Sequence, residues 1–282
     1  MAKKNVQVVR FIRKLQGGSQ PVLVEGINGI LYVLKFRNNV QGPQVLFNEA
    51  AGIQLYAACG LAVPVWEPLL LSKGFIERNR GCWMDGPNGP IRPESGLCLG
   101  TRFLTPIDQV SEILPGDCYA HVDNRSCFWM AWLIDVCCNQ ADDRQAVFVK
   151  RASESYSAVF IDFGHCFGGP HGTEHPNPMT CMYTDPGIYP HLTEAQLERY
   201  LKMCRKLNSS YLIERIKALP LEWQSTNAFK QVMRGINLLS DDTFVESMLM
   251  RVLRSHKGSP RELTSAESTL YCWRELLSSF SF

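Results

Sequence analysis

The sequence lacks the features that would direct it to a membrane or a secretory route. It has no run of about eighteen apolar residues, which a membrane-spanning helix requires, and its first residues do not form the apolar stretch of a signal peptide. We therefore expect a cytoplasmic protein with no membrane partner. No two of its eleven cysteines have zinc-ligand spacing. Several lie in apolar runs, where a thiol behaves as a small hydrophobe, so we interpret them as reduced; disulfide pairing is the alternative.

An excess of charge of either sign is also missing. Charged residues make up 20% of the 282 residues, and the formal net charge is +2. This balance gives no reason to expect nucleic acid as an obligatory partner. A hydrophobic content of 45% is enough for one large domain or two lobes. There are no internal repeats, and no Gly-x-Gly-x-x-Gly phosphate-binding motif is present.

The most informative feature that is present is a short apolar run leading into Asp162-Phe163-Gly164. The run, 158–161, is typical of a buried strand that ends at a cleft. Placing a carboxylate there is costly unless a metal or a donor compensates for its lost hydration. Asp162 is therefore predicted to hold the metal of a phosphoryl-transfer enzyme.

Two upstream residues have the types and the order that such chemistry requires. Lys35 lies inside the strand-like run Tyr32-Val33-Leu34-Lys35-Phe36, and we expect it to reach nucleotide phosphates in a wet cleft. Glu49 follows near the start of a helix-like run and can fix the lysine by an ion pair. The alternatives are a strand lysine that extends to solvent and an acid that merely stabilises a helix N-terminus.

The loop 139–145, just before the Asp162 strand, supplies candidates for the transfer itself. Two adjacent aspartates cannot both point at one hydroxyl, so we assign catalysis to Asp142, with Asp143 as the alternative. Arg144 is expected either to neutralise the transferred phosphate or to pair with the Asp-Phe-Gly carboxylate. Gln145 is a candidate second metal ligand through its amide oxygen.

Two further loops are candidates for contacts with substrates. The polar stretch 38–44 is a possible cover for phosphates through backbone N–H groups, or else a solvent loop. The segment 169–190, rich in Pro, Gly and His, occupies the position of an activation loop and is a candidate for contacting an acceptor. We interpret its histidines as loop residues rather than as a zinc site.

Hydrophobic patterns predict an α+β, protein-kinase-like fold with two lobes. The N-lobe, residues 1–103, is expected to be a small antiparallel sheet with one helix, and the C-lobe, residues 104–282, to be mainly helical. Residues 74–105 are interpreted as an irregular excursion or a pair of short strands, with 96–103 as the hinge. The predicted strands are 21–25, 31–36, 63–71 and 158–161, and the predicted helices are 45–59, 127–136, 194–206, 209–218, 227–239, 242–256 and 264–279.

At these positions the chain resembles the HipA-like kinases, a bacterial branch of the protein-kinase-like superfamily that is itself similar to phosphatidylinositol kinases. The resemblance spans roughly residues 20 to 170. It is carried by Tyr32-Val33-Leu34-Lys35-Phe36, Asn48-Glu49-Ala50-Ala51-Gly52, Leu61-Ala62-Val63-Pro64, Asn139-Gln140-Ala141-Asp142-Asp143-Arg144-Gln145-Ala146-Val147-Phe148 and Phe160-Ile161-Asp162-Phe163-Gly164-His165.

The resemblance implies binding of ATP and magnesium and transfer of the γ-phosphoryl group to a hydroxyl, a protein Ser or Thr in the first place. It implies a phosphate-binding Lys35 with its partner Glu49, a catalytic Asp142 and a magnesium ligand Asp162. One departure stands out: the kinases place a metal-binding Asn five residues after the catalytic Asp, where this chain has Val147. A pseudokinase that acts as a binding module and a small-molecule or lipid kinase remain as alternatives. The acceptor, the oligomeric state and any regulatory partner are left open.

Overall fold

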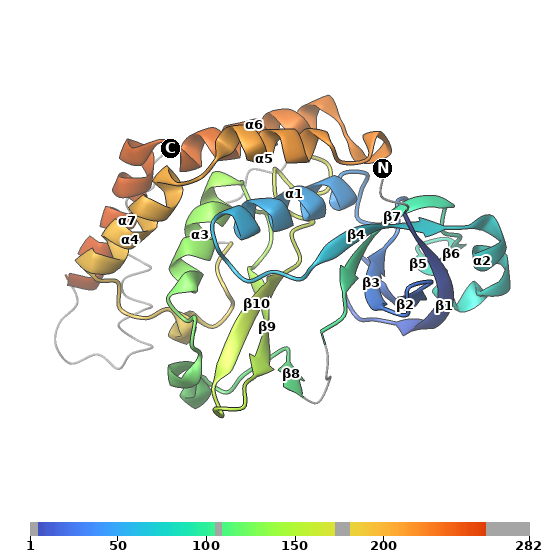
Figure 1. Ribbon diagram of the computed structural model, residues 1–282, viewed down its shortest axis with the longest axis horizontal. Helices are drawn as coiled ribbons and strands as arrows, with labels where there is room; N and C mark the ends of the chain where they lie inside the picture. Colours follow the sequence, from blue (N-terminus) through green and yellow to red (C-terminus); the bar gives the residue numbers. More distant parts are fainter. Residues whose placement is uncertain (1–4, 105–108, 173–180, 258–282) are drawn as a thin grey trace.

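A closed strand barrel lies at one end of the molecule and a group of helices at the other (Figure 1). The computed structural model describes residues 5–104, 109–172 and 181–257, and side chains as far as residue 253. The predicted helix 264–279 lies outside the described residues, as do residues 173–180 of the predicted activation-loop segment.

The barrel has five strands in the order β1-β2-β3-β7-β4. Its neighbours pair antiparallel except β1 and β4, which pair in parallel over two residues and so close the barrel. The predicted antiparallel sheet was therefore incomplete. Strand β1 was not predicted because eight of its nine residues are at least partly exposed, so the alternation of apolar residues is weak. The strands are β1 (Val6–Lys14), β2 (Val22–Gly26), β3 (Leu31–Lys35), β4 (Trp66–Leu71) and β7 (Gly96–Arg102).

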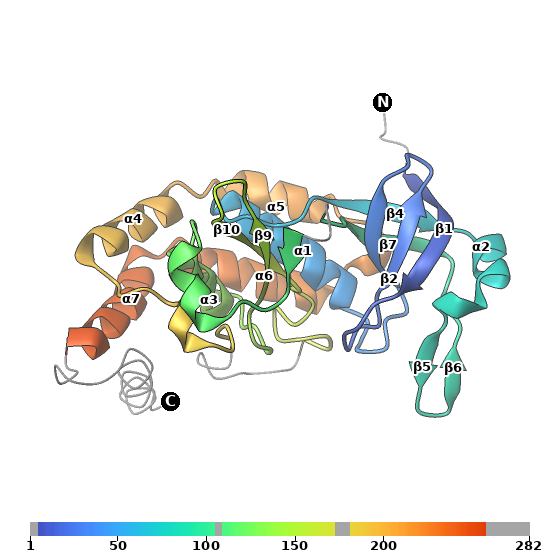
Figure 2. The same cartoon turned by 90° about the horizontal axis from the view of Figure 1, so that it is seen from below.

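The segment predicted as the hinge is itself a barrel strand. Residues 96–102 form β7, which pairs with β3 on one side and β4 on the other, so the connection to the rest of the chain begins after Arg102. Of the two interpretations of 74–105, a pair of short strands is present. These form a hairpin that projects from the barrel (Figure 2). The elements here are α2 (Lys73–Arg78), η1 (Arg80–Cys82), β5 (Met84–Gly86) and β6 (Gly89–Ile91).

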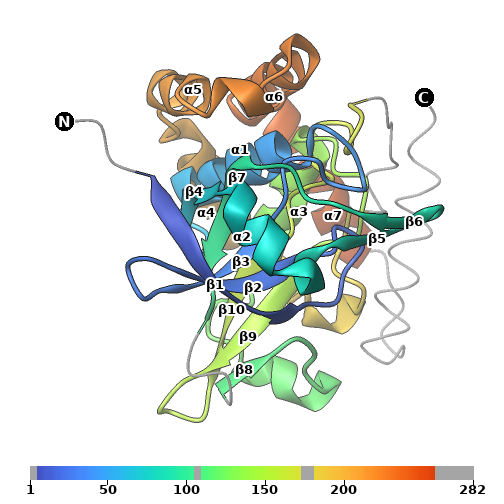
Figure 3. The same cartoon turned by 90° about the vertical axis from the view of Figure 1, so that its right-hand side faces the viewer.

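Helix α1 (Val45–Ala58) follows the barrel strands in sequence but belongs to the core of the helical end. All its residues from Val45 to Tyr56 are buried, so it is surrounded by protein rather than lying on a sheet with one face in water. It contacts β7, but it also contacts α5 and α6, and Figure 3 shows it behind the barrel and next to these helices. The helix thus contacts the barrel, as an N-lobe helix is expected to do, but most of its side chains are buried by the helical end. Its side chains join a separate core from that of the barrel.

Besides α1, the described part of the helical end contains the five helices α3 to α7 and, beside them, a three-stranded sheet in the order β10-β9-β8. Three of the helices begin at capping residues that the sequence displays: Thr193, Asn208 and Ser225 each accept a hydrogen bond from the backbone of the first turn. Strand β9, whose first residue is Gln145, was not predicted. The elements are β8 (Val110–Ser111), η3 (Gly116–His121), α3 (Cys127–Cys137), β9 (Gln145–Lys150), β10 (Tyr156–Ile161), η4 (Pro186–Ile188), α4 (Glu194–Arg205), α5 (Ser209–Lys217), η5 (Leu221–Trp223), α6 (Thr226–Leu239) and α7 (Asp242–Lys257).

A glycine in α1 lets the Asp-Phe-Gly segment approach the helix closely. A Cβ atom added to Gly52 would lie 2.6 Å from Cβ of Phe163. The Phe163 ring then packs edge-on against Tyr56, one turn further along, with ring centroids 4.7 Å apart. The residue after Asp162 is thereby fixed to α1.

A fully buried ion pair between Arg144 and Asp135 lies next to the end of β10 and bonds its backbone. The side chains of Arg144 and Asp135 are both 0% exposed, and Nη1 of Arg144 lies 3.3 Å from Oδ1 of Asp135. Nη2 of Arg144 donates to the Ile161 carbonyl at 2.9 Å and to the Asp162 carbonyl, and Nη1 donates to the Tyr56 hydroxyl at 3.2 Å. Burial raises the pKa of Asp135 to about 6, although the Arg144 charge opposes this shift. One guanidinium thus joins α1, α3 and the end of β10, just before and at Asp162.

We expect Gly52→Ala to destabilise the protein by about 1–3 kcal/mol, the usual cost of overpacking a core. Ala in place of a helical Gly ordinarily stabilises by about 0.4–1 kcal/mol, so the sign of the effect is decisive in chemical denaturation. Gly74→Ala in α2 is the matched control, because its new methyl meets only the mobile end of Arg78, at 3.2 Å. A stabilising Gly52→Ala would show that Phe163 does not pack this closely.

We expect the Arg144–Asp135 pair to leave a pH signature when the parent is compared with Asp135→Asn. Because the folded-state pKa of Asp135 is raised, the stability that its protonation contributes is full below about pH 4 and is lost as the pH rises through about 6. The free energy of unfolding of the parent minus that of the variant should therefore fall between pH 4 and 7 in urea titrations. A difference that rises with pH would contradict this account. Glu198→Gln, at an exposed position of α4, controls for the loss of one carboxylate.

Candidate active site

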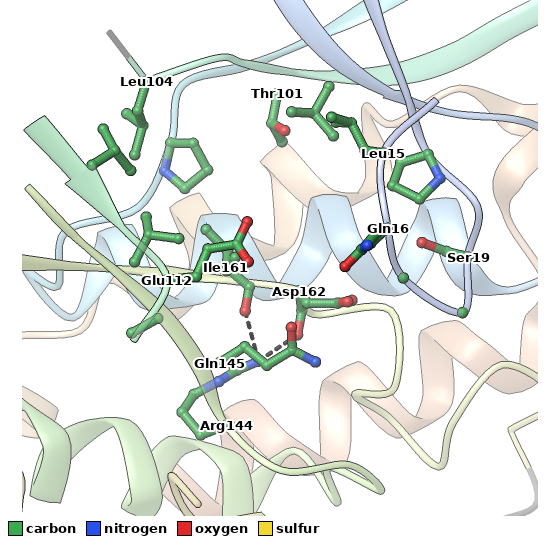
Figure 4. Close-up of a pocket in the computed structure, with 18 of the residues that line it drawn as sticks. Leu15, Gln16, Ser19, Thr101, Leu104, Glu112, Arg144, Gln145, Ile161 and Asp162 are labelled. Carbon is green, nitrogen blue, oxygen red and sulfur yellow. Dashed lines mark hydrogen bonds between the residues drawn. The ribbon is translucent and has the colours of Figure 1, made fainter. Parts of the chain in front are cut away.

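A cavity of about 1010 Å³ lies between the barrel and the β9–β10 sheet. Lys35, Asp142 and Asp162, which are far apart in the sequence, all line it. Figure 4 shows its walls, with Asp162, Gln145 and Arg144 on one side and Leu15, Gln16 and Ser19 of the β1–β2 turn on the other. The described residues that line it also include Val33, Glu49, Thr101, Leu104, Val147, Ile161 and Thr184.

Lys35 links the barrel to the Asp-Phe-Gly segment and to α1 through two ion pairs. Its Nζ lies 2.7 Å from Oε2 of Glu49 and 2.9 Å from Oδ1 of Asp162. Lys35 is the last residue of β3, Glu49 lies in the second turn of α1, and Asp162 follows β10 directly. The structure therefore brings these three residues together at one point.

The lysine is less accessible than the sequence suggested. Its side chain is only 9% exposed, so the expectation of a wet cleft around Lys35 is corrected. Burial alone would lower the lysine pKa, but the carboxylates of Asp162 and Glu49 raise it above its usual value. Burial raises the pKa of Glu49, while Lys35 holds the pKa of Asp162 below its usual value despite burial. At neutral pH Lys35 is therefore a fixed cation.

The N-terminal part of α1 also binds the backbone after Asp162. Oε2 of Glu49 accepts a hydrogen bond from the Phe163 amide at 2.9 Å, in addition to its bond from Lys35. The Asn48 side chain donates to the carbonyls of Gly164 and Gly169, both at 3.0 Å. Asn48 is a positioning residue to which sequence reasoning assigned no role, although it belongs to the segment 48–52 that carries the resemblance.

Asp162 is held in a conformation that residues other than glycine rarely adopt. Its φ is +58°, in the left-handed region, and its carbonyl accepts a hydrogen bond from Arg144. Its side chain is 29% exposed, and Lys35 bonds only Oδ1. Carboxylate oxygen is the ligand type that Mg²⁺ prefers, and Mg²⁺ commonly binds through one or two carboxylates together with substrate phosphates. Asp162 therefore fits such an ion.

The two adjacent aspartates have different surroundings. Asp142 lines the cavity, and its Oδ1 accepts a hydrogen bond from the Asp143 amide at 2.9 Å. Asp143 is exposed and bonds Thr184, whose Oγ1 lies 3.3 Å from its Oδ2. Asp142 thus lines the cavity itself, whereas Asp143 only contacts a residue that lines the cavity, Thr184.

Arg144 and Gln145 point to different environments. The guanidinium of Arg144 is buried and pairs with Asp135, and its bond to Asp162 goes to the backbone carbonyl rather than to the carboxylate. Gln145 is exposed and lines the cavity at the first position of β9. Val147 lies two residues further on the same face of this strand and lines the cavity too. An amide and an isopropyl group therefore line the cavity two residues apart on β9.

The β1–β2 turn is a site element that sequence reasoning missed. Residues 16–19 of this turn line the cavity, and a bond of 3.1 Å from the Asn39 side chain to the Ser19 carbonyl holds them. The signal was Gly17-Gly18 between two strand-like runs, which was overlooked because β1 was not recognised. The predicted phosphate cover at 38–44 contributes Gln41, which lines the cavity and lies 3.0 Å from the ring of His165.

Within the described part of the chain, no group of three or more His, Cys, Asp and Glu side chains has an arrangement that could hold a metal by itself. The cysteines among these residues are free, and most of them are buried. None of the described helices combines the length and the apolar character that crossing a membrane demands.

Comparison with known proteins gives a fold and no family. No protein-family model and no curated protein matches the sequence. Among solved structures, the Helicobacter pylori proinflammatory kinase CtkA superposes with a TM-score of 0.52 at 10% identity, over 87% of this chain and 96% of that one. Two structures of the Golgi casein kinase, one with Mn/ADP bound, give TM-scores of 0.45 and 0.43 at 11% identity. They cover 86% and 88% of this chain and 72% and 71% of those chains. The likeness to the Helicobacter kinase shows that this chain has a kinase-like α+β fold.

Proposed function

We propose that this protein is an ATP- and magnesium-dependent kinase of the HipA-like type, which transfers a γ-phosphoryl group to a hydroxyl of a protein Ser or Thr. The observation that carries the proposal is Lys35, bonded at once to Glu49 and Asp162 on the wall of a cavity of about 1010 Å³. Phosphoryl transfer needs a fixed cation, a carboxylate for the metal and a space for the nucleotide in one place. These three residues and the cavity meet that requirement.

Each wall of the cavity has a task in this proposal. The apolar side chains of Val33, Leu104 and Ile161 offer a surface for the nucleotide base. Lys35 presents its ammonium to the phosphates, and backbone N–H groups of the β1–β2 turn cover them. When bound, Mg²⁺ would neutralise charge on the transferred group, and Asp162 would hold it, with Gln145 as the second ligand.

The remaining residues orient the reaction. Asp142, which lines the cavity, accepts the proton of the acceptor hydroxyl, with Asp143 as the alternative. Arg144 acts on Asp162 through its carbonyl, so we assign it a positioning role and not the phosphate contact considered from the sequence. Glu49 and Asn48 fix the backbone that follows Asp162.

One observation favours a second function, that of a pseudokinase that binds nucleotide without turning it over. Val147 stands on the cavity wall where the kinases that the chain resembles have a metal-binding Asn. An apolar side chain cannot coordinate Mg²⁺. Gln145, on the same face of β9, is the residue that decides between the two functions. A kinase for a small molecule or a lipid would use the same nucleotide cavity and would differ only in its acceptor.

We expect ATP and magnesium together to raise the melting temperature, because a ligand that binds only the folded state stabilises it. At a free ligand concentration of about 100 Kd the gain is about 2.7 kcal/mol, or roughly 5–10 °C for a chain of this size. Asp162→Asn should remove the magnesium-dependent part of the shift and leave Lys35 paired with Glu49. Equal melting temperatures with and without millimolar nucleotide would refute nucleotide binding.

We expect Asp142→Asn to lower transfer from radiolabelled ATP by about 10²–10⁴-fold, the usual contribution of a general base, without changing the nucleotide-induced thermal shift. Asp143→Asn is the matched control for exogenous acceptors, and the larger loss identifies the base. Lys35→Ala is a poor probe here, since removing one partner of a buried ion pair costs about 3–5 kcal/mol. A thermal shift without transfer to any acceptor in the parent would establish the pseudokinase instead.

A further inference from the structure

The loop 181–189 is pinned against the cavity on both sides of Thr184. Before it, the Met182 carbonyl accepts a hydrogen bond from the Arg144 amide at 2.8 Å. After it, the Asp185 carboxylate accepts from the Tyr119 hydroxyl at 2.9 Å and from the Gly187 amide at 2.8 Å. Hydrogen bonds on both sides of Thr184 therefore fix its position in the loop.

Thr184 itself is exposed, so its side chain has no packing role in the core. It lines the same cavity as Lys35 and Asp162, and its hydroxyl donates to Oδ2 of Asp143 at 3.3 Å. A hydroxyl that donates to a carboxylate is the starting arrangement for general-base catalysis, and such bonds are often long before substrate binds. The chain thus carries a hydroxyl acceptor inside its own site.

Three other hydroxyls of the described residues do not combine these properties. Ser155 donates to the Asp123 carboxylate at 2.9 Å, but this pair lies outside the residues that line the cavity. Tyr119 lines the cavity and bonds Asp185, but it is only 4% exposed. Ser19 lines the cavity as well and is 3% exposed. Thr184 alone among these four is exposed, lines the cavity and bonds a carboxylate.

We propose that Thr184 is a modification site of this protein, phosphorylated in cis by the chain's own active site with Asp143 as the base. The inference rests on the proposed kinase function and names an acceptor for it. Thr184 Oγ1 attacks the γ-phosphorus of ATP and passes its proton to the Asp143 carboxylate. The Oγ1–P bond forms as the bond from the γ-phosphorus to the β,γ-bridging oxygen breaks, and ADP leaves.

The product would differ from the starting loop in its electrostatics. A phosphothreonine carries a charge of about −1.5 to −2 at neutral pH. At position 184 it would lie next to Asp143 and Asp185, and like charges repel. Phosphorylation therefore breaks the contact with Asp143 and moves residue 184 away from the cavity wall, which frees Asp143.

The test is site-resolved mass spectrometry of the full chain after incubation with ATP and magnesium. We expect phosphate on Thr184, none on it in Thr184→Val, and phosphate on the new hydroxyl in Thr184→Ser. Asp143→Asn should slow the modification at least about 100-fold, whereas Ser155→Ala should leave it unchanged. The rate per chain should stay constant when the protein concentration is raised tenfold, because the reaction is intramolecular. The nucleotide-induced thermal shift of Thr184→Val should equal that of the parent.

The outcomes separate this inference from the proposed function. Phosphate on other residues or on an added acceptor, with Thr184 unmodified, overturns the inference and leaves the kinase function in place. A rate per chain that rises with concentration overturns modification in cis. Absence of both a thermal shift and any transfer overturns the proposed function and this inference with it. A thermal shift without transfer anywhere retains nucleotide binding alone.

Discussion

The site depends on the double ion pair of Lys35 with Glu49 and Asp162. It joins three elements: a barrel strand, a helix of the other core, and the segment that follows β10. Burial weakens the hydration of these charges, so both carboxylates need the lysine ammonium and the ammonium needs its carboxylate partners. The same cation that makes the buried carboxylates tolerable is the one that a nucleotide phosphate would meet.

Several interactions hold the short backbone segment 162–164 next to this ion pair. Glu49 and Asn48 bind it from α1, Gly52 lets Phe163 approach that helix, and Arg144 bonds the Asp162 carbonyl. Asp162 keeps a left-handed backbone conformation within these contacts. Residues held in such conformations persist only where their surroundings over-determine them, and they cluster at functional sites. The position of the Asp162 carboxylate is therefore set by the helical core, whereas Lys35 is set by the barrel.

Some residues that line the cavity were predicted from the sequence, and others were not. Asp142 and Gln145 lie on it as their order in the chain suggested, but so do the β1–β2 turn and Thr184. Val147, an apolar residue, lies on the same wall. In the proposed function, transfer depends on Lys35 of the barrel and Glu49 of α1, and also on side chains of β9 and of the loop before it.

The sequence by itself determined most of the helices and barrel strands, although not β1 or β9, and the order of the candidate site residues. A lysine in a strand, an acid in a helix, an aspartate pair and Asp-Phe-Gly can be recognised because each depends on neighbours along the chain. Only the tertiary structure decided that β1 closes a barrel, that α1 belongs to the helical core, and that Arg144 pairs with Asp135 rather than with the Asp162 carboxylate. The physical reason is that these three features depend on contacts between residues that are distant in the sequence. Strand β1 is mostly exposed and α1 is buried on all sides, so neither has a clear pattern of apolar residues. The sequence around an arginine does not show whether its guanidinium is buried.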